Sequence, residues 1–146
     1  MSGSVDFKRV SFVICILSFS HSLFGSNIIA PFKFPFFGEL FSSIWVSKNG
    51  YVTVIEPESD NLNMEFVKED GLRGMIAPFW SVLNDPDNNN GIKLKIDDKR
   101  IILQWDNFTP FIDPGKASFQ LEIVEDGSIY FHYKDVESWG YILNYG

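Results

Sequence analysis

Apolar residues recur at every second position through much of the second half of the chain. Four segments show this spacing, residues 92–96, 101–105, 119–123 and 129–133, with mostly polar residues between them. Because successive side chains of a strand point to opposite faces, a period of two predicts strands with one buried face. No segment keeps helical spacing over ten residues. The chain is therefore predicted to be all-β.

Turn signals separate the apolar runs. Asn49-Gly50 lies between two such runs, and Asp126-Gly127 separates the last two alternating segments. Both dipeptides favour hairpins, in which glycine supplies a positive φ at little cost. We therefore predict hairpins at both places, with positive φ at Gly50 and Gly127.

The aromatic run at residues 28–38 indicates a further strand. Phe32, Phe34 and Phe36 are two residues apart and would share one face of an extended segment. Pro31 and Pro35 cannot donate a ladder hydrogen bond. This segment is therefore predicted to be an edge strand or a strand interrupted by a bulge.

About eight short strands with turns between them predict an antiparallel sandwich or barrel. One connection, at about residues 56–74, is long, polar and acidic. A chain of 146 residues suits one domain and can bury a core without disulfides or metal.

The charge balance excludes one class of partner. The chain has 12 Lys and Arg against 19 Asp and Glu, a net charge of −7. Nucleic-acid phosphates require a basic surface, so we expect no nucleic-acid partner. The only cysteine, Cys15, leaves no thiol in the rest of the chain for a disulfide, a metal site or a nucleophile.

The N-terminus has the pattern of a secretory signal peptide. Lys8 and Arg9 precede the apolar run at residues 10–17, and small residues follow at 18–26. The apolar run is too short to span a membrane. We predict a signal peptide at residues 1–25, a domain at 26–146, and no membrane-spanning segment in the mature chain. The alternative is a buried N-terminal element of the domain.

Four motifs, in order, resemble those of the nidogen-like extracellular domain. Residues 34–38 (FPFFG) and 45–52 (WVSKNGYV) are similar to its opening motif, and residues 76–84 (IAPFWSVLN) to its next. Residues 100–107 (RIILQWDN) and 119–133 (FQLEIVEDGSIYFHY) are similar to two of its strands. The resemblance implies a secreted or cell-surface β-sandwich module used in adhesion or extracellular structure, with no catalytic residues.

The chain departs from the family pattern at two points. Val82 stands where the family often has aspartate, which weakens any calcium role carried over from the resemblance. The family pattern also continues beyond the last matched strand. Residues 141–145 alternate as a closing strand would, and a truncated C-terminus is the other interpretation.

Asp85, Asp87 and Asn89 are the candidate metal ligands. Their hard oxygens lie in one short segment and suit calcium. The spacing does not match a helix-loop-helix calcium loop, and the same residue types are ordinary turn formers. Calcium is the only cofactor that the sequence offers.

Three further side chains are candidates for function. Trp139 lies in a polar stretch, so of the four tryptophans it is the best candidate for an exposed ring that stacks on a sugar. Asn107 begins an Asn-Phe-Thr sequon, which carries a glycan only in a eukaryotic secretory pathway. His132 is the only histidine after residue 21, and a lone histidine on a strand is usually a packing or solvent-facing residue.

These observations favour a non-enzymatic, exported adhesion or structural module whose partner is an extracellular protein or a glycan. A carbohydrate-binding module of the same architecture is the alternative. An enzyme is disfavoured because no activated nucleophile with a base is visible.

Overall fold

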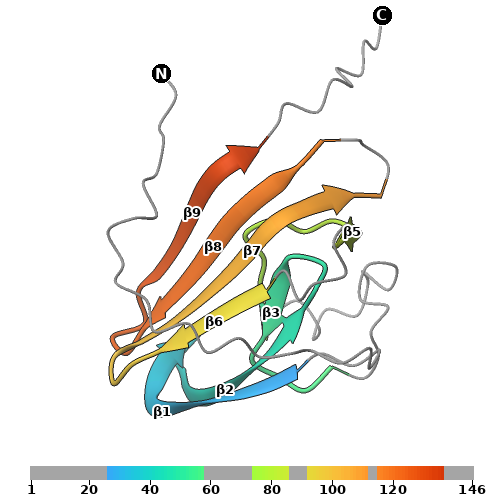
Figure 1. Ribbon diagram of the computed structural model, residues 1–146. Helices are drawn as coiled ribbons and strands as arrows, with labels where there is room; N and C mark the ends of the chain where they lie inside the picture. Colours follow the sequence, from blue (N-terminus) through green and yellow to red (C-terminus); the bar gives the residue numbers. More distant parts are fainter. Residues whose placement is uncertain (1–25, 58–73, 86–91, 112–114, 137–146) are drawn as a thin grey trace, which may run out of the picture.

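The computed structural model describes residues 26–57, 74–85, 92–111 and 115–136. All elements assigned within these ranges are strands, and they form two antiparallel sheets (Figure 1). The predicted all-β sandwich is confirmed, and the described residues alone contain nine strands, where about eight were predicted. The predicted signal peptide at 1–25, most of the long connection and the proposed closing strand at 141–145 lie outside the described residues.

The first sheet has the strand order β1-β2-β3-β4. Its members are β1 (Ser26–Phe36), β2 (Glu39–Ser47), β3 (Tyr51–Thr53) and β4 (Met75–Ile76). Strand β1 lies at the edge, and its pairing with β2 shifts register between Ile29 and Phe34. Pro31 falls within that shift, so the predicted edge strand and the predicted bulge are both present.

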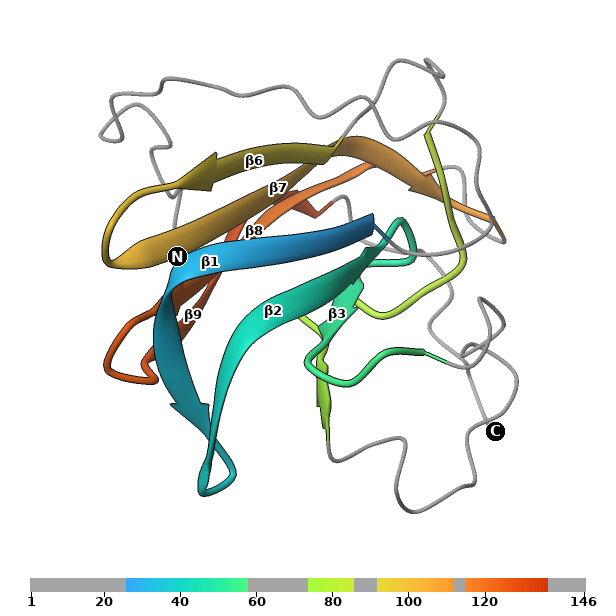
Figure 2. The same ribbon diagram turned by 90° about the horizontal axis from the view of Figure 1, so that it is seen from below.

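The second sheet has five strands and packs face to face on the first (Figure 2). Its members are β5 (Leu83–Asn84), β6 (Ile92–Ile96), β7 (Arg100–Pro110), β8 (Ala117–Val124) and β9 (Ile129–Val136). Strands β5 and β6 both pair with β7, which is followed by β8 and then β9. Strand β9 therefore forms the edge of this sheet opposite β5 and β6.

Hairpin turns join several of the neighbouring strands. Gly50 has φ 79° and Gly127 has φ 88°, which confirms both predicted turns. A third hairpin, between β1 and β2, was not predicted. Its two turn residues, Phe37 and Gly38, have φ 47° and 81°, the pattern of a type I′ turn.

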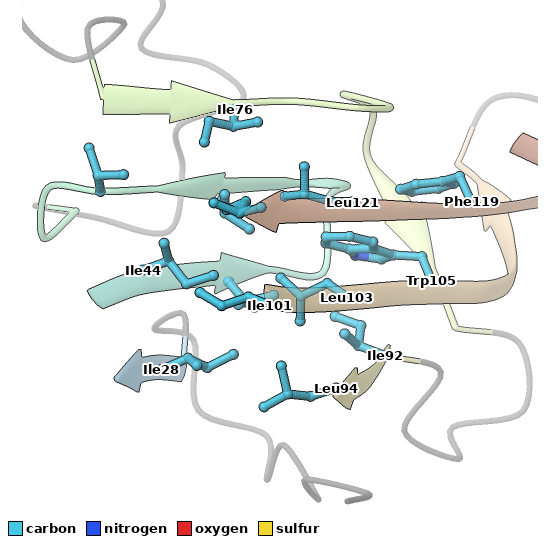
Figure 3. Packing of buried hydrophobic residues seen from close by; sticks show 14 of the residues in the cluster. Ile28, Ile44, Ile76, Ile92, Leu94, Ile101, Leu103, Trp105, Phe119 and Leu121 are labelled. Carbon is cyan, nitrogen blue, oxygen red and sulfur yellow. The ribbon is translucent and has the colours of Figure 1, made fainter. Parts of the chain in front are cut away.

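The core lies between the two sheets (Figure 3). Its centre is made by side chains with no exposed surface: Phe34, Ile44, Val52, Ile101, Leu103, Trp105, Phe119, Leu121 and Ile123. The Trp105 ring stacks on the Phe119 ring, with the two ring centroids 5.0 Å apart. The period of two in the sequence placed these residues on the buried faces of their strands, as expected.

Two polar side chains on the outer face of the second sheet are less exposed to solvent than the alternating sequence pattern predicts. Ser118 is 2% exposed and Gln120 is 4% exposed, although both alternate with the core residues of β8. Each is satisfied by a neighbour on β7: Gln120 Nε2 donates to Gln104 Oε1 at 2.8 Å, and Ser118 Oγ donates to Asp106 Oδ1 at 3.3 Å. Paired side chains on adjacent central strands thus cover one another.

Candidate functional site

Residues of the sequence motifs meet in one buried junction. The N–H of Phe79 donates to the carbonyl oxygen of Gly50 at 3.2 Å, and the N–H of Ser81 donates to that of Asn49 at 3.2 Å. A Cβ added at Gly50 would lie 1.9 Å from the Phe79 carbonyl oxygen. Only glycine permits this approach of two backbone segments.

Side chains complete the junction. Asn49 Oδ1 accepts from the N–H of Leu83 at 3.1 Å, and Trp105 Nε1 donates to the Ser47 carbonyl oxygen at 3.1 Å. The Phe119 ring packs against Phe79 with centroids 5.2 Å apart. Because these buried groups find partners within the fold, the motif residues at the junction hold the β2–β3 hairpin against the second sheet. Their role is structural.

The structure describes only one of the three predicted calcium ligands. Asp85 follows β5 and is half-buried, whereas Asp87 and Asn89 lie outside the described residues. In the described part of the chain, no three His, Cys, Asp or Glu side chains gather as a metal site. The calcium site stays a prediction.

The predicted sugar platform also stays a prediction, because Trp139 lies outside the described residues. Of the other tryptophans, Trp105 belongs to the core, as expected, and Trp45 and Trp80 are half-buried. None of these three offers a fully exposed ring for a sugar to stack on.

Asn107 lies on a bulge of β7, at a register shift between Trp105 and Phe108. Its φ is 56°, its side chain is exposed, and its N–H donates to Ser118 Oγ at 3.0 Å. Because the Asn107 side chain is exposed, a glycan could be attached to the folded domain there.

Charged side chains form a network on the outer face of the second sheet. Arg100 contacts Asp97 at 3.2 Å and Glu122 at 3.5 Å, and His132 Nε2 lies 3.3 Å from Glu122 Oε2. Burial raises the pKa of Asp97, but the Lys99 N–H and the Arg100 charge together hold it below its ordinary value. Partly exposed pairs such as these contribute little to stability. His132 thus lies within hydrogen-bond distance of a carboxylate on the neighbouring strand, at the margin of this network.

The β1–β2 hairpin displays the most exposed large apolar side chain of the described residues. Phe37 is 81% exposed and Leu40 is 65% exposed. The Phe37 ring rests edge-on against Phe36, with centroids 4.7 Å apart, and Phe36 packs on the core. We call Phe37 and Leu40 the hairpin tip.

Phe37 occupies a backbone region that bulky residues rarely adopt. At φ 47° an L side chain crowds its own carbonyl, at a cost of about 1–2 kcal/mol. The exposed ring recovers little of this through burial. A mostly exposed residue held in such a conformation is a candidate for binding.

Two acidic side chains lie near the hairpin tip, one next to it in sequence and one in the turn that contacts Pro35. Glu39 is exposed beside it, and the β8–β9 turn packs so closely that a Cβ at Gly127 would lie 2.7 Å from Pro35 Cγ. That turn carries Asp126, whose pKa is lowered by hydrogen bonds from Ser128. Figure 1 shows the β6–β7 and β8–β9 turns at the same end of the second sheet.

Within the described ranges, the structure contains no helix long and apolar enough to cross a membrane. No curated protein and no solved structure matches the chain. One family does match, described as NIDO related, over residues 20–141. This range includes all four motifs and every described strand, and it agrees with the nidogen-like resemblance. The chain therefore belongs to the NIDO-related family.

Proposed function

We propose that this protein is an exported or cell-surface adhesion module that binds another extracellular protein through its hairpin tip. Its membership of the NIDO-related family suggests an extracellular module. The observation that carries the finer proposal is Phe37, a strained and 81% exposed aromatic residue at the end of a well-packed sandwich. The proposal includes no catalytic activity.

The surroundings of the hairpin tip define the chemistry of the partner. A single phenylalanine in a desolvated pocket can act as a binding hot spot worth about 2 kcal/mol or more. Acidic side chains such as Glu39 and Asp126 around it favour a pocket with a basic rim. The same acidic rim disfavours an anionic membrane surface.

Adhesion is tested with beads that carry the purified chain and cells of the organism that encodes it. Phe37→Gly should reduce adhesion about tenfold or more, because it removes the exposed ring. Ile29→Ser is the matched control, since Ile29 is also highly exposed (73%) but lies on β1 away from the turn. Adhesion should keep its strength in the control.

Two results would overturn the proposal. If beads that carry the wild-type chain bind no cells, the proposal of an adhesion function is wrong. If Phe37→Gly and Ile29→Ser lose adhesion equally, the hairpin tip is not the adhesion site. Adhesion that is blocked by free sugars would favour the carbohydrate-binding alternative.

Export is tested separately, by sequencing the N-terminus of the mature protein after expression in its natural form. The signal-peptide pattern predicts cleavage after Ser20, Ser22 or Gly25, and thus a product that begins at residue 21, 23 or 26. A product that stays in the cytoplasm and retains Met1 would contradict the localisation.

A further inference from the structure

The buried junction contains a dipeptide that is chemically labile in an unfolded chain. Asparagine followed by glycine deamidates readily, because the backbone nitrogen of the glycine attacks the asparagine side chain and no Cβ hinders the attack. The pair occurs twice in this chain, at Asn49-Gly50 and at Asn90-Gly91. Asn90-Gly91 lies outside the described residues, whereas Asn49-Gly50 joins β2 to β3 within the junction.

The fold requires both residues of the Asn49-Gly50 pair. A Cβ at position 50 would lie 1.9 Å from the Phe79 carbonyl oxygen, so only glycine fits there. The Asn49 side chain is 9% exposed, and its Oδ1 accepts the Leu83 N–H at 3.1 Å. The packing of the junction therefore keeps a labile pair at its centre.

The same contacts restrain the atoms that would react. The Asn49 N–H donates to Ser47 Oγ at 3.1 Å, and the Asn49 side-chain oxygen is held as described above. The carbonyl oxygens of Asn49 and Gly50 accept backbone N–H groups of the segment that contains Phe79, each at 3.2 Å. Ring closure requires the side chain and the following peptide to rotate toward each other, and that rotation breaks these hydrogen bonds.

We infer that Asn49-Gly50 is a deamidation site controlled by folding, inert in the folded chain and reactive once the β2–β3 hairpin leaves the junction. In the opened chain the Gly50 N–H gives its proton to hydroxide, and the nitrogen attacks Asn49 Cγ. The side-chain nitrogen takes a proton from water and leaves as ammonia. Water then opens the succinimide ring at either carbonyl, which yields aspartate or isoaspartate. This inference does not depend on the proposed function.

Neither product fits the junction. Aspartate places a carboxylate where the Asn49 side chain is 9% exposed, and burial of a charge is costly unless the charge is paired. Isoaspartate adds a carbon to the main chain before Gly50. This carbon shifts Gly50 relative to the Phe79 backbone, which already leaves no room for a Cβ. Deamidation therefore makes the loss of the hairpin from the junction permanent.

Incubation of the purified full chain at mildly alkaline pH, in buffer and in urea, tests the control by folding. Peptide mass spectrometry measures deamidation at each site. In urea, Asn49 and Asn90 should react at similar rates, because glycine follows each. In buffer, Asn49 should react about tenfold or more slowly than in urea, because only opened molecules react.

Two results would overturn this part of the inference. Equal rates at Asn49 in buffer and in urea would show that the fold does not protect the site. A rate at Asn49 far below that of Asn90 in urea would show that the local sequence protects it without the fold.

The effect of the product is tested with Asn49→Asp, which should fail to fold or should unfold at a lower urea concentration than wild type. Asn27→Asp is the matched control, because it makes the same change at an exposed asparagine on β1, and it should unfold like wild type. An Asn49→Asp chain that unfolds like both would contradict a poor fit of aspartate.

Refolding of wild-type chains that have partly deamidated in urea tests both products without a variant. After dilution into buffer, the refolded fraction should contain a smaller share of chains modified at Asn49 than the unfolded fraction. Equal shares in the two fractions would overturn the inference that deamidation makes the loss permanent.

Discussion

Three glycines with almost the same φ allow backbone strain to be separated from close packing. Gly38, Gly50 and Gly127 have φ between 79° and 88°. A Cβ added at Gly38 would meet nothing within 4 Å. One added at Gly127 would lie 2.7 Å from the Pro35 ring carbon Cγ, and one added at Gly50 would lie 1.9 Å from the Phe79 carbonyl oxygen. Alanine substitutions at the three positions therefore introduce the same backbone strain, but differ in the steric contact that the added Cβ makes.

The magnitudes follow from these contacts. Alanine at positive φ costs about 1–2 kcal/mol at each site, and Gly38→Ala should cost no more than this. In Gly50→Ala the Phe79 segment must also move. It then loses its hydrogen bond to Gly50, worth about 0.5–1.5 kcal/mol, and the Phe79–Phe119 ring contact, worth a similar amount. The expected loss is about 2–5 kcal/mol, with Gly127→Ala between the two.

Urea unfolding of the three variants, followed by tryptophan fluorescence, gives the free energy of unfolding of each. The reasoning predicts the order Gly38, Gly127, Gly50 from least to most destabilising. Equal losses at all three positions would refute it, because they would mean that the β2–β3 hairpin does not pack against the Phe79 segment.

Three other predictions concern single groups. Thr53 Oγ1 is buried without a hydrogen-bond partner, so Thr53→Val should raise the free energy of unfolding by about 1 kcal/mol; a loss would contradict this. Burial raises the pKa of Tyr133, whose hydroxyl donates to the Pro78 carbonyl oxygen. The protonated Tyr133 hydroxyl should therefore stabilise the fold fully below a pH of about 10, and this stabilisation should be lost as the pH rises through the raised pKa. In urea unfolding, Tyr133→Phe should show a weaker dependence of the free energy of unfolding on pH. In a eukaryotic secretory host, the wild-type chain should carry a glycosidase-sensitive glycan that Asn107→Gln removes and Thr109→Ser keeps; an unmodified wild-type chain would show that the sequon is not used.

The long strands were predictable because each carries its own pattern. Period-two spacing placed Leu103, Trp105 and Leu121 on buried faces, and the Asn-Gly and Asp-Gly pairs marked two turns. The short strands β4 and β5 were not predictable in this way. Two residues contain no period, and these strands exist only because Ile76 and Leu83 find partners in β3 and β7.

The β1–β2 turn was missed for a different reason. Turn prediction relies on residues that adopt positive φ readily, such as glycine and asparagine. Phe37 is neither, and the apolar run at 28–38 continues through it without a polar residue except Lys33. A strained residue carries no local signal of its own, because the surrounding hairpin imposes the conformation.

Exposure separates two kinds of residue within the FPFFG motif. Phe34 is buried, Phe36 packs on the core, and Gly38 supplies the second positive φ of the turn. Pro35 lies against the β8–β9 turn. Each of these four has a structural reason to be present. Glycine at position 37 would form the same turn without the strain of about 1–2 kcal/mol, which offsets the loss of the edge-on contact between Phe37 and Phe36, worth about 0.5–1.5 kcal/mol. Phe37→Gly should therefore stabilise the fold or leave it unchanged in urea unfolding while it weakens adhesion. A stability loss as large as that of Gly50→Ala would instead assign the Phe37 ring to the packing of the hairpin.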